Sequence, residues 1–333
     1  MSGPLKSVAG LVCLFVLATA GCSAQADPDE QDDRGDRASS APVTAYAPYV
    51  SATTAADQDA AGSPTAYNLA FVLSSGEGCA PAWNGTLPLD DTSVTSRISE
   101  LTASGAAARV SFGGASGTEL AAACDSAEEL AKAYGTALDA AGATRADFDI
   151  EGDELADPDS VALRSEAIAL LQEERTELEV SFTVPVMPSG LDEDVLDLLD
   201  SANDHGVRVG TVNLMTMNYG ESYDGDMGDY AVTSAEAANA QLMEVFGLSG
   251  TAAWRGMALT SMIGVNDVEG ETFTLADAAQ VRAFAEEKGI AWVSMWSSFR
   301  DQQCAEGSGA EDATTDCSGV EQEPGAFGEA FAG

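Results

Sequence analysis

The chain has 333 residues, 45% of them apolar, which is enough to build a sizeable buried core. Its 55 acidic and 14 basic side chains give a formal net charge of −41. This charge argues against nucleic acid as a partner, because the phosphates would be repelled, and it suits a well-solvated secreted protein.

Residues 1–21 have the pattern of an export signal. Lys6 is followed by an apolar run over 8–20, which is too short to span a membrane as a mature helix. The stretch from Thr19 to Cys22 is similar to a bacterial lipobox and predicts a lipid on Cys22, with no other contact between the protein and a membrane. Thr19 departs from the usual aliphatic residue at that position, so plain secretion stays open as an alternative.

Two further segments follow this signal. Residues 22–41 are rich in Asp, Ser, Gln and Ala, and this composition predicts a solvated tether. Residues 42–333 are expected to form one folded domain. Both routes of export place that domain outside the cell, either free or anchored to the outer face of the membrane, and we expect a monomer.

Four cysteines follow the lipobox, and export places them in an oxidising compartment. They allow three pairings, of which we predict Cys79–Cys124 and Cys304–Cys317, since the second closes a Gly/Ser/Asp-rich loop. A metal site is the alternative use of four cysteines. No C-x-x-C pair occurs, however, and the sequence has a single histidine, His205, so we expect neither a metal nor a cofactor.

Along the chain, β-branched and aromatic runs alternate with Ala/Glu/Leu-rich stretches of helical spacing. The predicted strands are 43–50, 66–73, 108–112, 146–150, 179–184, 210–215, 255–260 and 290–295. The predicted helices are 91–104, 118–141, 158–175, 192–204, 233–247 and 274–288. Thr274 and Asp277 resemble a capping box at the start of the last helix.

Eight strands that alternate with helices predict an α/β fold of the (β/α)8 type, a single-domain TIM barrel. A doubly wound open sheet is the alternative, but no Gly-x-Gly-x-x-Gly follows an early strand. In a barrel, the catalytic groups lie at the carboxyl ends of the strands.

Asp147, Asp149 and Glu151 alternate with Phe148 and Ile150 at the end of the fourth predicted strand. Alternate residues of a strand share a face, so the three carboxylates should repel one another and raise the pKa of at least one. A carboxylic acid that is still protonated near neutral pH suits general-acid cleavage of a glycosidic bond.

This spacing alone is weak evidence, since 55 acids in 333 residues produce it by chance about once or twice. A second case occurs at Asp267, Glu269 and Glu271, where Gly270 favours a turn. The first case is distinguished by its position between apolar strand residues.

These residues resemble glycoside hydrolase family 18, the chitinases and endo-β-N-acetylglucosaminidases, and in particular a bacterial branch without an α+β insertion domain. The family pattern D-x-x-D-x-D-x-E falls on 144–151, where Thr144 replaces the first Asp. The family's S-x-G-G falls on 111–114, and its N-V-M-T-Y-D falls on 213–218. Trp296 matches the tryptophan floor of the sugar site.

The resemblance covers roughly 43–331 and implies retaining, substrate-assisted hydrolysis of β-1,4-linked N-acetylglucosamine polymers. Glu151 would protonate the leaving oxygen and later deprotonate water. Asp149 would hold the acetamide N–H group, and Asp147 would share a proton with Asp149. A purely structural buried acid is the alternative for Asp147. The implied substrate-binding residues are Trp296, Met215, Met217, Asn218, Tyr219, Gly113 and Gly114.

Two departures from the family pattern bear on activity. Met217 replaces the tyrosine that supports the acetamide, and Asn218 replaces the following aspartate. Tyr219 comes next and should point to the other face if the strand stays regular. A bulge could redirect Tyr219; otherwise the site works without that donor. Two alternative functions therefore stay open: a non-catalytic carbohydrate-binding protein on the same barrel, and an endo-β-N-acetylglucosaminidase that acts on N-glycans.

Overall fold

The computed structural model describes residues 43–309 and 311–333. The predicted export signal, the lipidation site at Cys22 and the tether lie outside the described residues. Within the described ranges, no helix combines the length and the apolar character needed to cross a bilayer.

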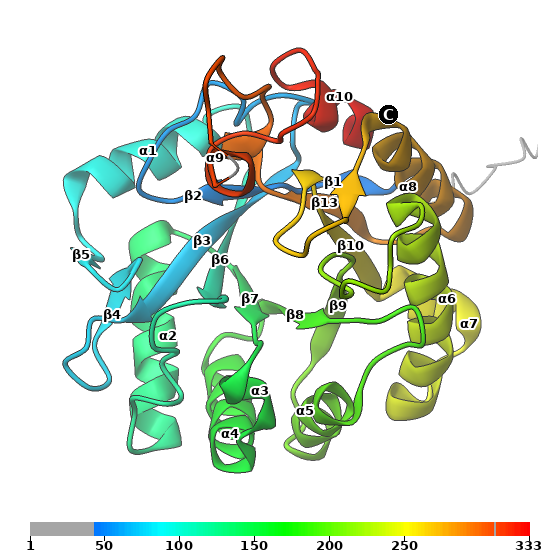
Figure 1. The fold of residues 1–333 in the computed structure, drawn as a ribbon. Helices are drawn as coiled ribbons and strands as arrows, with labels where there is room; N and C mark the ends of the chain where they lie inside the picture. Colours follow the sequence, from blue (N-terminus) through cyan, green and yellow to red (C-terminus); the bar gives the residue numbers. More distant parts are fainter. Residues whose placement is uncertain (1–42, 310) are drawn as a thin grey trace, which may run out of the picture. The chain divides into compact units, whose positions relative to one another are not determined.

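A closed ring of parallel strands forms the centre of the domain (Figure 1). The ring consists of β1 (Ala45–Tyr46), β2 (Tyr49–Ser51), β3 (Ala66–Ser74), β6 (Ala107–Gly113), β7 (Arg145–Asp149), β8 (Glu179–Pro185), β9 (Val209–Met215), β10 (Met257–Met262) and β13 (Trp292–Trp296). Each predicted strand corresponds to one position of this ring. The predicted (β/α)8 barrel is therefore confirmed.

The first barrel strand is divided into two short pieces. Pro48 lies between β1 and β2 and has no backbone N–H to donate. The first piece pairs with β13 and the second with β3, so the segment joins both neighbours and closes the ring. The Pro48 carbonyl still accepts the N–H of Asn68 at 2.9 Å.

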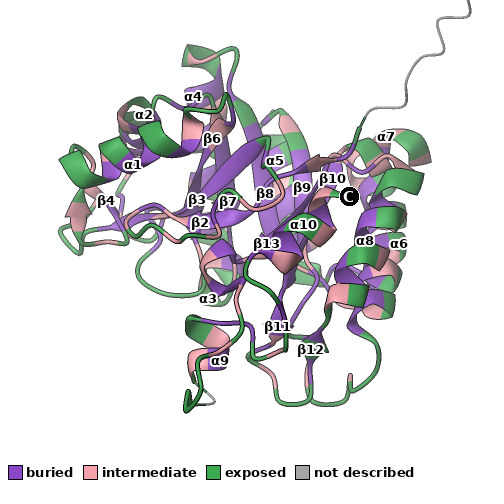
Figure 2. Ribbon diagram, turned by 90° about the horizontal axis from the view of Figure 1, so that it is seen from above, coloured by how far each residue is buried: buried purple, intermediate pink, exposed green. Residues whose placement is uncertain are grey.

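Helices surround the barrel, and Figure 2 shows buried strands inside helices whose outer faces are exposed. The helices are α1 (Thr92–Thr102), α2 (Ala127–Ala141), α3 (Asp153–Ala156), α4 (Pro158–Glu174), α5 (Glu193–Asp204), α6 (Met227–Phe246), α7 (Gly250–Arg255), α8 (Leu275–Lys288), α9 (Asp312–Thr315) and α10 (Ala326–Ala332). The predicted capping box is present at α8, between Thr274 and Asp277.

Two predicted helix starts are wrong. Residues 118–126 form turns rather than the first turns of α2, because the Ser126 side chain accepts the N–H of Glu129 and starts the helix there. Gly142 ends this helix with a φ of 61°, as expected. In the other case α6 begins at Met227, six residues earlier than predicted, since Asp226 caps it.

Several short elements had no counterpart in the prediction. They are β4 (Pro81–Trp83), β5 (Leu87–Pro88), β11 (Gly264–Val265), β12 (Thr272–Phe273), the 3-10 helix η1 (Ser298–Arg300), α3, α7, α9 and α10. Of these, the antiparallel hairpin β11–β12 lies directly after barrel strand β10. It contributes to the candidate site described below.

An aromatic layer packs between the barrel and its helices and sets which way the fourth strand faces. Phe148 lies between Phe112 and Phe182 of the neighbouring strands, with ring centres 5.3 and 5.7 Å away. Tyr134 of α2 packs against Phe112 at 4.7 Å. Because Phe148 faces the helices, the alternate side chains of Asp147 and Asp149 face the barrel interior.

Both predicted disulfides are present in the structure. Cys79–Cys124 joins the turn between β3 and β4 to the loop that precedes α2. Cys304–Cys317 closes the loop that follows η1, and this loop contacts the β11–β12 hairpin: the N–H of Val265 donates to the Ser318 carbonyl at 2.7 Å.

Candidate active site

A pocket of about 100 Å³ lies at the carboxyl ends of the barrel strands. Six predicted site residues line it: Asp149, Glu151, Met215, Met217, Asn218 and Trp296. Six further residues of its lining were not predicted: Tyr49, Phe71, Ala115, Thr183, Thr260 and Asp267. The position agrees with the rule that barrel enzymes place their catalytic groups at this end.

Asp147 lies beneath the pocket and is saturated by hydroxyl donors. Its Oδ1 accepts from Ser181 at 2.7 Å and Thr183 at 2.8 Å, and its Oδ2 accepts from Ser111 at 2.6 Å and Tyr49 at 2.8 Å. Four donors occupy the lone-pair sites of one carboxylate. Strand register explains the arrangement, because Ser111 and Ser181 stand beside Asp147 on the two adjacent strands.

Asp149 is placed differently from Asp147. It is 6% exposed, and its Oδ1 has no hydrogen-bond partner among the described residues. Burial raises its pKa well above the usual range, and the charges of Glu151 and Asp147 raise it further. The structure shows no hydrogen bond between Asp147 and Asp149 within the described ranges, so the expected sharing of a proton has no support in this arrangement.

Glu151 follows the end of β7 and lines the pocket. Burial, and after it the charge of Asp267, raise the pKa of this side chain to about 7. The expectation that one acid of the triplet titrates near neutral pH is therefore met at Glu151. The charge that raises the pKa of Glu151 comes from Asp267 on a distant segment, while repulsion within the triplet is expressed at Asp149, whose pKa the charge of Glu151 raises.

Asp267 is the acidic residue of the pocket that the sequence interpretation missed. It lies in the turn of the β11–β12 hairpin, and the interpretation of this segment as a turn is correct. Its Oδ2 accepts from Asn218 Nδ2 at 3.3 Å, and its backbone N–H donates to Asn218 Oδ1 at 3.2 Å. Its place just beyond a barrel strand is the signal that could have identified it.

The same hairpin also holds the backbone segment from Asn218 to Gly220, which follows β9. Glu271 Oε1 accepts the N–H of Gly220 at 2.8 Å, and Glu271 is 1% exposed. Asn218 has a φ of 54° two residues before this contact. A left-handed conformation is uncommon outside glycine but is tolerated by asparagine. The hairpin thus keeps Asn218 turned towards Asp267.

Trp296 forms an aromatic wall with Tyr49 of β2 and Phe71 of β3, which follow β13 around the ring. Its ring stacks on Phe71 with centres 5.6 Å apart and an interplanar angle of 25°, and Tyr49 lies 5.9 Å away. The Trp296 carbonyl accepts from Arg300 Nη1 at 3.1 Å. A half-buried aromatic surface next to a carboxyl group suits stacking against a sugar ring.

No family model matches the chain. The catalytic domain of a hyperthermophilic chitinase from Pyrococcus furiosus matches it with a TM-score of 0.76 and 30% sequence identity, over 87% of this chain and 94% of that one. A GH18 chitinase from Pseudoalteromonas aurantia shares the fold, with a TM-score of 0.55 and 11% identity over 76% of this chain and 94% of that one.

The chain belongs to the chitinases of glycoside hydrolase family 18.

Curated relatives agree with this family. A probable bifunctional chitinase/lysozyme of Escherichia coli strain K12 is 30% identical over 290 residues, which is 78% of this chain and 31% of that protein. Endochitinase 11 of Metarhizium anisopliae is 31% identical over 295 residues, 79% of this chain and 54% of that protein. The chain thus spans about a third and about half of the lengths of these relatives.

Three predicted substrate-binding residues of this family 18 chain do not line the pocket. Tyr219 is 4% exposed and packs between Tyr223 and Tyr230, and Ser234 Oγ donates to its hydroxyl at 3.4 Å. It does not enter the pocket, and its direction is not set by strand alternation, because β9 ends at Met215 and Asn218 has a φ of 54°. Met217 therefore stands alone in the place that the tyrosine of the family pattern would occupy.

The other two, Gly113 and Gly114, shape the backbone beneath the pocket. The Gly114 N–H donates to the Asp149 carbonyl at 2.9 Å. A Cβ on Gly113 would clash with that same carbonyl, and a Cβ on Gly114 would lie 2.9 Å from the Phe71 ring. These glycines are therefore needed for close packing against Asp149 and Phe71.

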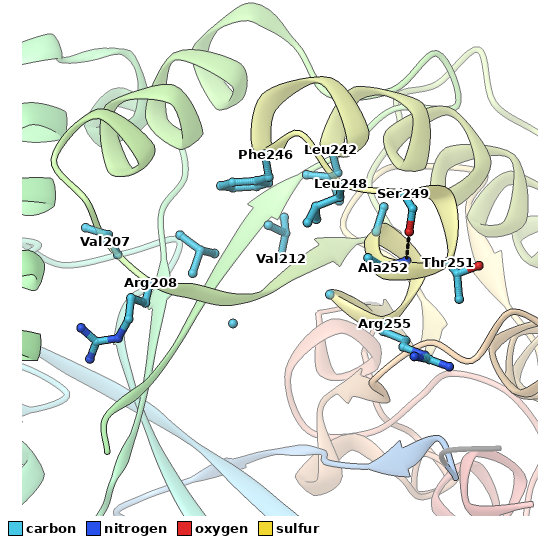
Figure 3. A pocket seen from close by; sticks show the side chains of 14 residues that line it. Val207, Arg208, Val212, Leu242, Phe246, Leu248, Ser249, Thr251, Ala252 and Arg255 are labelled. Atoms are coloured by element: carbon cyan, nitrogen blue, oxygen red, sulfur yellow. Dashed lines mark hydrogen bonds between the residues drawn. The ribbon is translucent and has the colours of Figure 1, made fainter. Parts of the chain in front are cut away.

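A roomier hollow of about 580 Å³ opens at the other end of the barrel (Figure 3). It lies between the start of β9 and helices α6 and α7, and its lining includes Val207, Leu242, Phe246 and Leu248. No Asp or Glu lines it. Of these two pockets, the smaller one is lined by carboxyl groups, those of Asp149, Glu151 and Asp267.

Proposed function

We propose that this chain is a glycosidase that hydrolyses β-1,4-linked N-acetylglucosamine polymers, chitin or chito-oligosaccharides, with retention of configuration. The observation that carries the proposal is Glu151, a carboxyl with a pKa of about 7 that lines a pocket beside Asp149 and Trp296. Active domain 2 of the Pyrococcus furiosus chitinase, at 29% identity, is described in complex with chito-oligosaccharides. The curated relatives are also named as chitinases.

In the proposed reaction, Glu151 gives its proton to the glycosidic oxygen as the bond to the anomeric carbon breaks. The acetamide oxygen of the substrate attacks that carbon and forms an oxazolinium ion. Glu151, now ionised, then removes a proton from the water that opens the ring. A pKa near 7 suits both steps, because the acid and the base forms are both populated at neutral pH.

Asp149 has the features needed to hold the acetamide group. Its buried Oδ1 lacks a hydrogen-bond partner among the described residues, and an acetamide N–H would supply one. An ionised Asp149 would also stabilise the positive charge of the oxazolinium. Asp147 lies beneath it, accepts the hydroxyls of Tyr49 and Thr183 and so keeps both side chains in place.

Met217 cannot donate a hydrogen bond to the acetamide, so the family's tyrosine contact is missing. We propose that the site works without it, at a cost of about 10²-fold in rate, judged from the loss of one donor in an oxyanion-type site. The hydroxyls of Thr183 and Thr260 line the pocket but already donate to Asp147 and Asn213, whereas Asn218 Nδ2 keeps a second hydrogen beyond the one that it gives to Asp267.

The test is the release of reducing ends from N-acetylglucosamine oligomers by the purified chain, with Glu151→Gln as the matched control. We expect turnover by the unsubstituted chain, and sugar binding without turnover by the variant. Binding without turnover by both proteins would favour the carbohydrate-binding alternative, which the changes at Thr144 and Met217 support. Faster cleavage of a high-mannose glycopeptide than of chitin oligomers would favour an endo-β-N-acetylglucosaminidase.

We also propose that the protein is exported and carries a lipid on Cys22. The two disulfides support an oxidising, extracellular setting. Expression of the whole chain followed by detergent partitioning tests the anchor. The intact chain should enter the detergent phase and the Cys22→Ala variant the aqueous phase; partitioning of both into water would indicate plain secretion.

A further inference from the structure

A second polar pocket, of about 320 Å³, lies at the end of the barrel opposite Glu151. Its walls come from the first residues of four barrel strands: Arg109 near the start of β6, residues 179–181 of β8, Thr211 of β9 and Trp292 of β13. The candidate active site uses the carboxyl ends of the same strands. The two pockets are therefore separated by the interior of the barrel.

Arg109 is a buried cation without a carboxylate partner. It is 5% exposed, and none of the ion pairs among the described residues includes it. Its Nη1 donates to the neutral amide oxygen of Asn68 at 2.6 Å, and its guanidinium carbon lies 4.0 Å from the centre of the Trp292 ring. Burial lowers the pKa of Arg109, because the charged form loses water. The charges of Asp147 and Glu179 offset part of this effect from a distance, but neither carboxylate pairs with the guanidinium, and a buried charge is costly without a direct counter-ion.

A second donor with no partner lines the same pocket. Trp292 is 7% exposed, and its indole Nε1 is buried and makes no hydrogen bond among the described residues. A buried N–H group normally has an acceptor. Thr211 lines the same pocket. The residues of this lining thus carry a guanidinium, an indole N–H and a hydroxyl, and such a set of donors suits an anion with several oxygens.

The charges at the rim of this pocket agree with that interpretation. Arg208 lines the rim, and its Nη2 has only long contacts, 3.3 and 3.4 Å, to two backbone carbonyls. In Figure 3 the Arg208 side chain points away from Arg255 and from the apolar wall of the neighbouring hollow. The acid of the lining, Glu179, is paired with Arg145 Nε at 2.9 Å. Positive charge is thus concentrated here, in a chain whose formal net charge is −41.

We propose that this pocket binds a small oxyanion of the phosphate or sulfate class, held by the Arg109 guanidinium and the Trp292 indole N–H, with Thr211 and Arg208 as further donors. A planar guanidinium fork matches two oxygens of such an ion. The bound ion would neutralise the buried cation and join the starts of β6, β9 and β13. The proposal is independent of the glycosidase proposal, because none of the residues involved lines the pocket of Glu151.

The test uses the whole chain and inorganic phosphate as the probe. Isothermal titration should show saturable binding, and the thermal midpoint should rise more in sodium phosphate than in sodium chloride of equal ionic strength. Trp292→Phe removes only the N–H and keeps an aromatic ring under Arg109, so it should weaken phosphate binding by about tenfold. Arg109→Lys keeps the charge but loses the fork and should weaken binding by at least as much.

Arg255→Gln is the matched control, since it removes one exposed arginine from the neighbouring hollow without touching the pocket of Arg109. Its phosphate affinity should equal that of the unsubstituted chain. Equal midpoints in phosphate and chloride, or the same loss of affinity in Arg255→Gln as in Trp292→Phe, would overturn the proposal in favour of diffuse charge screening. If Arg109→Lys fails to fold, Trp292→Phe and Thr211→Val decide the question, since neither removes a charge.

Discussion

Asp267 and Asn218 exchange two hydrogen bonds across the mouth of the active-site pocket, one at 3.3 Å from the Asn218 amide and one at 3.2 Å from the Asp267 backbone. The family pattern places an aspartate where this chain has Asn218. The carboxylate has thus moved to the facing hairpin, and its charge reaches Glu151 from there.

The pH dependence of hydrolysis should report this charge. With protonated Glu151 as the proposed general acid, kcat/KM should fall as pH rises through about 7. Asp267→Asn removes the repelling charge. It should therefore move the alkaline limb of the pH–rate profile, where activity falls as pH rises, to lower pH by up to about one unit. A pH–rate profile on a chito-oligosaccharide measures the shift. Asp197→Asn, an equal charge change at an exposed position of α5, should leave the limb in place.

Restoring the family arrangement offers a complementary test. In the double variant Asn218→Asp/Asp267→Asn, the carboxylate and the amide exchange places. A repelling charge therefore faces Glu151 again. The alkaline limb should return towards its original position. A double variant that behaves like Asp267→Asn alone would show that the hairpin position, rather than the charge near Glu151, sets the profile.

Glu151 should also make stability depend on pH. Its folded pKa of about 7 lies above the ordinary 4.5, so the folded state binds the proton more tightly than the unfolded chain does. The resulting stabilisation is present below pH 4.5 and is lost as pH rises towards 7. Gln cannot ionise, so Glu151→Gln should not lose stability as pH rises. At pH 8 the variant should have a free energy of unfolding higher than that of the unsubstituted chain by up to about 3 kcal/mol.

Urea unfolding of the unsubstituted chain and of Glu151→Gln at pH 4 and at pH 8 measures this effect. The gap between the two proteins should be small at pH 4 and clear at pH 8. An equal gap at both values would assign the difference to packing instead of ionisation.

Asp147 should matter for both stability and rate. Asp147→Asn turns an amide N–H₂ group towards hydroxyls that now donate to a carboxylate, and this leaves buried donors without acceptors. We expect a loss of about 1–3 kcal/mol in the free energy of unfolding, together with a lower kcat. Ser181→Ala is the comparison, because it removes one of the four donors and leaves the charge. It should cost about 1 kcal/mol, and an equal cost in both variants would contradict the network.

The two disulfides should act differently on the enzyme. They close loops with sequence separations of 45 and 13 residues, so chain entropy predicts stabilisation of about 4 kcal/mol for Cys79–Cys124 and about 3 kcal/mol for Cys304–Cys317. Arg300 Nη2 donates to the carbonyls of Val265 and Ala313, both at 2.7 Å, and so links the second loop to the hairpin of Asp267.

Cys304→Ala/Cys317→Ala should therefore move the alkaline limb towards that of Asp267→Asn. Cys79→Ala/Cys124→Ala should lose more stability and leave the limb unchanged. Thermal melts and pH–rate profiles of the two double variants provide the measurement. A shifted limb in the Cys79/Cys124 variant alone would contradict the assigned roles.

The barrel and its catalytic strand were predictable because both depend on short-range periodicity. Phe148 and Ile150 alternate with Asp147, Asp149 and Glu151, and this alternation alone puts the acids on the inner face once helices cover the other. The same periodicity failed over 118–126, where apolar spacing suggests a helix but the Ser126 cap starts it later. Local capping geometry outweighed a weak spacing signal there.

The sequence by itself therefore determined the order of the barrel strands and main helices and the position of the acid triplet at the end of β7, and the structure selected the predicted disulfide pairing from the three that the sequence allowed. The tertiary structure alone decided which distant groups meet those acids. Tyr49, Asp267 and Phe71 lie far from Glu151 along the chain, and no local pattern ties them to it. Their convergence depends on closure of the ring through the broken first strand and on the path of the β11–β12 hairpin. Burial and charge at Glu151 arise from that convergence, because a pKa responds to neighbours in space and not to neighbours in sequence.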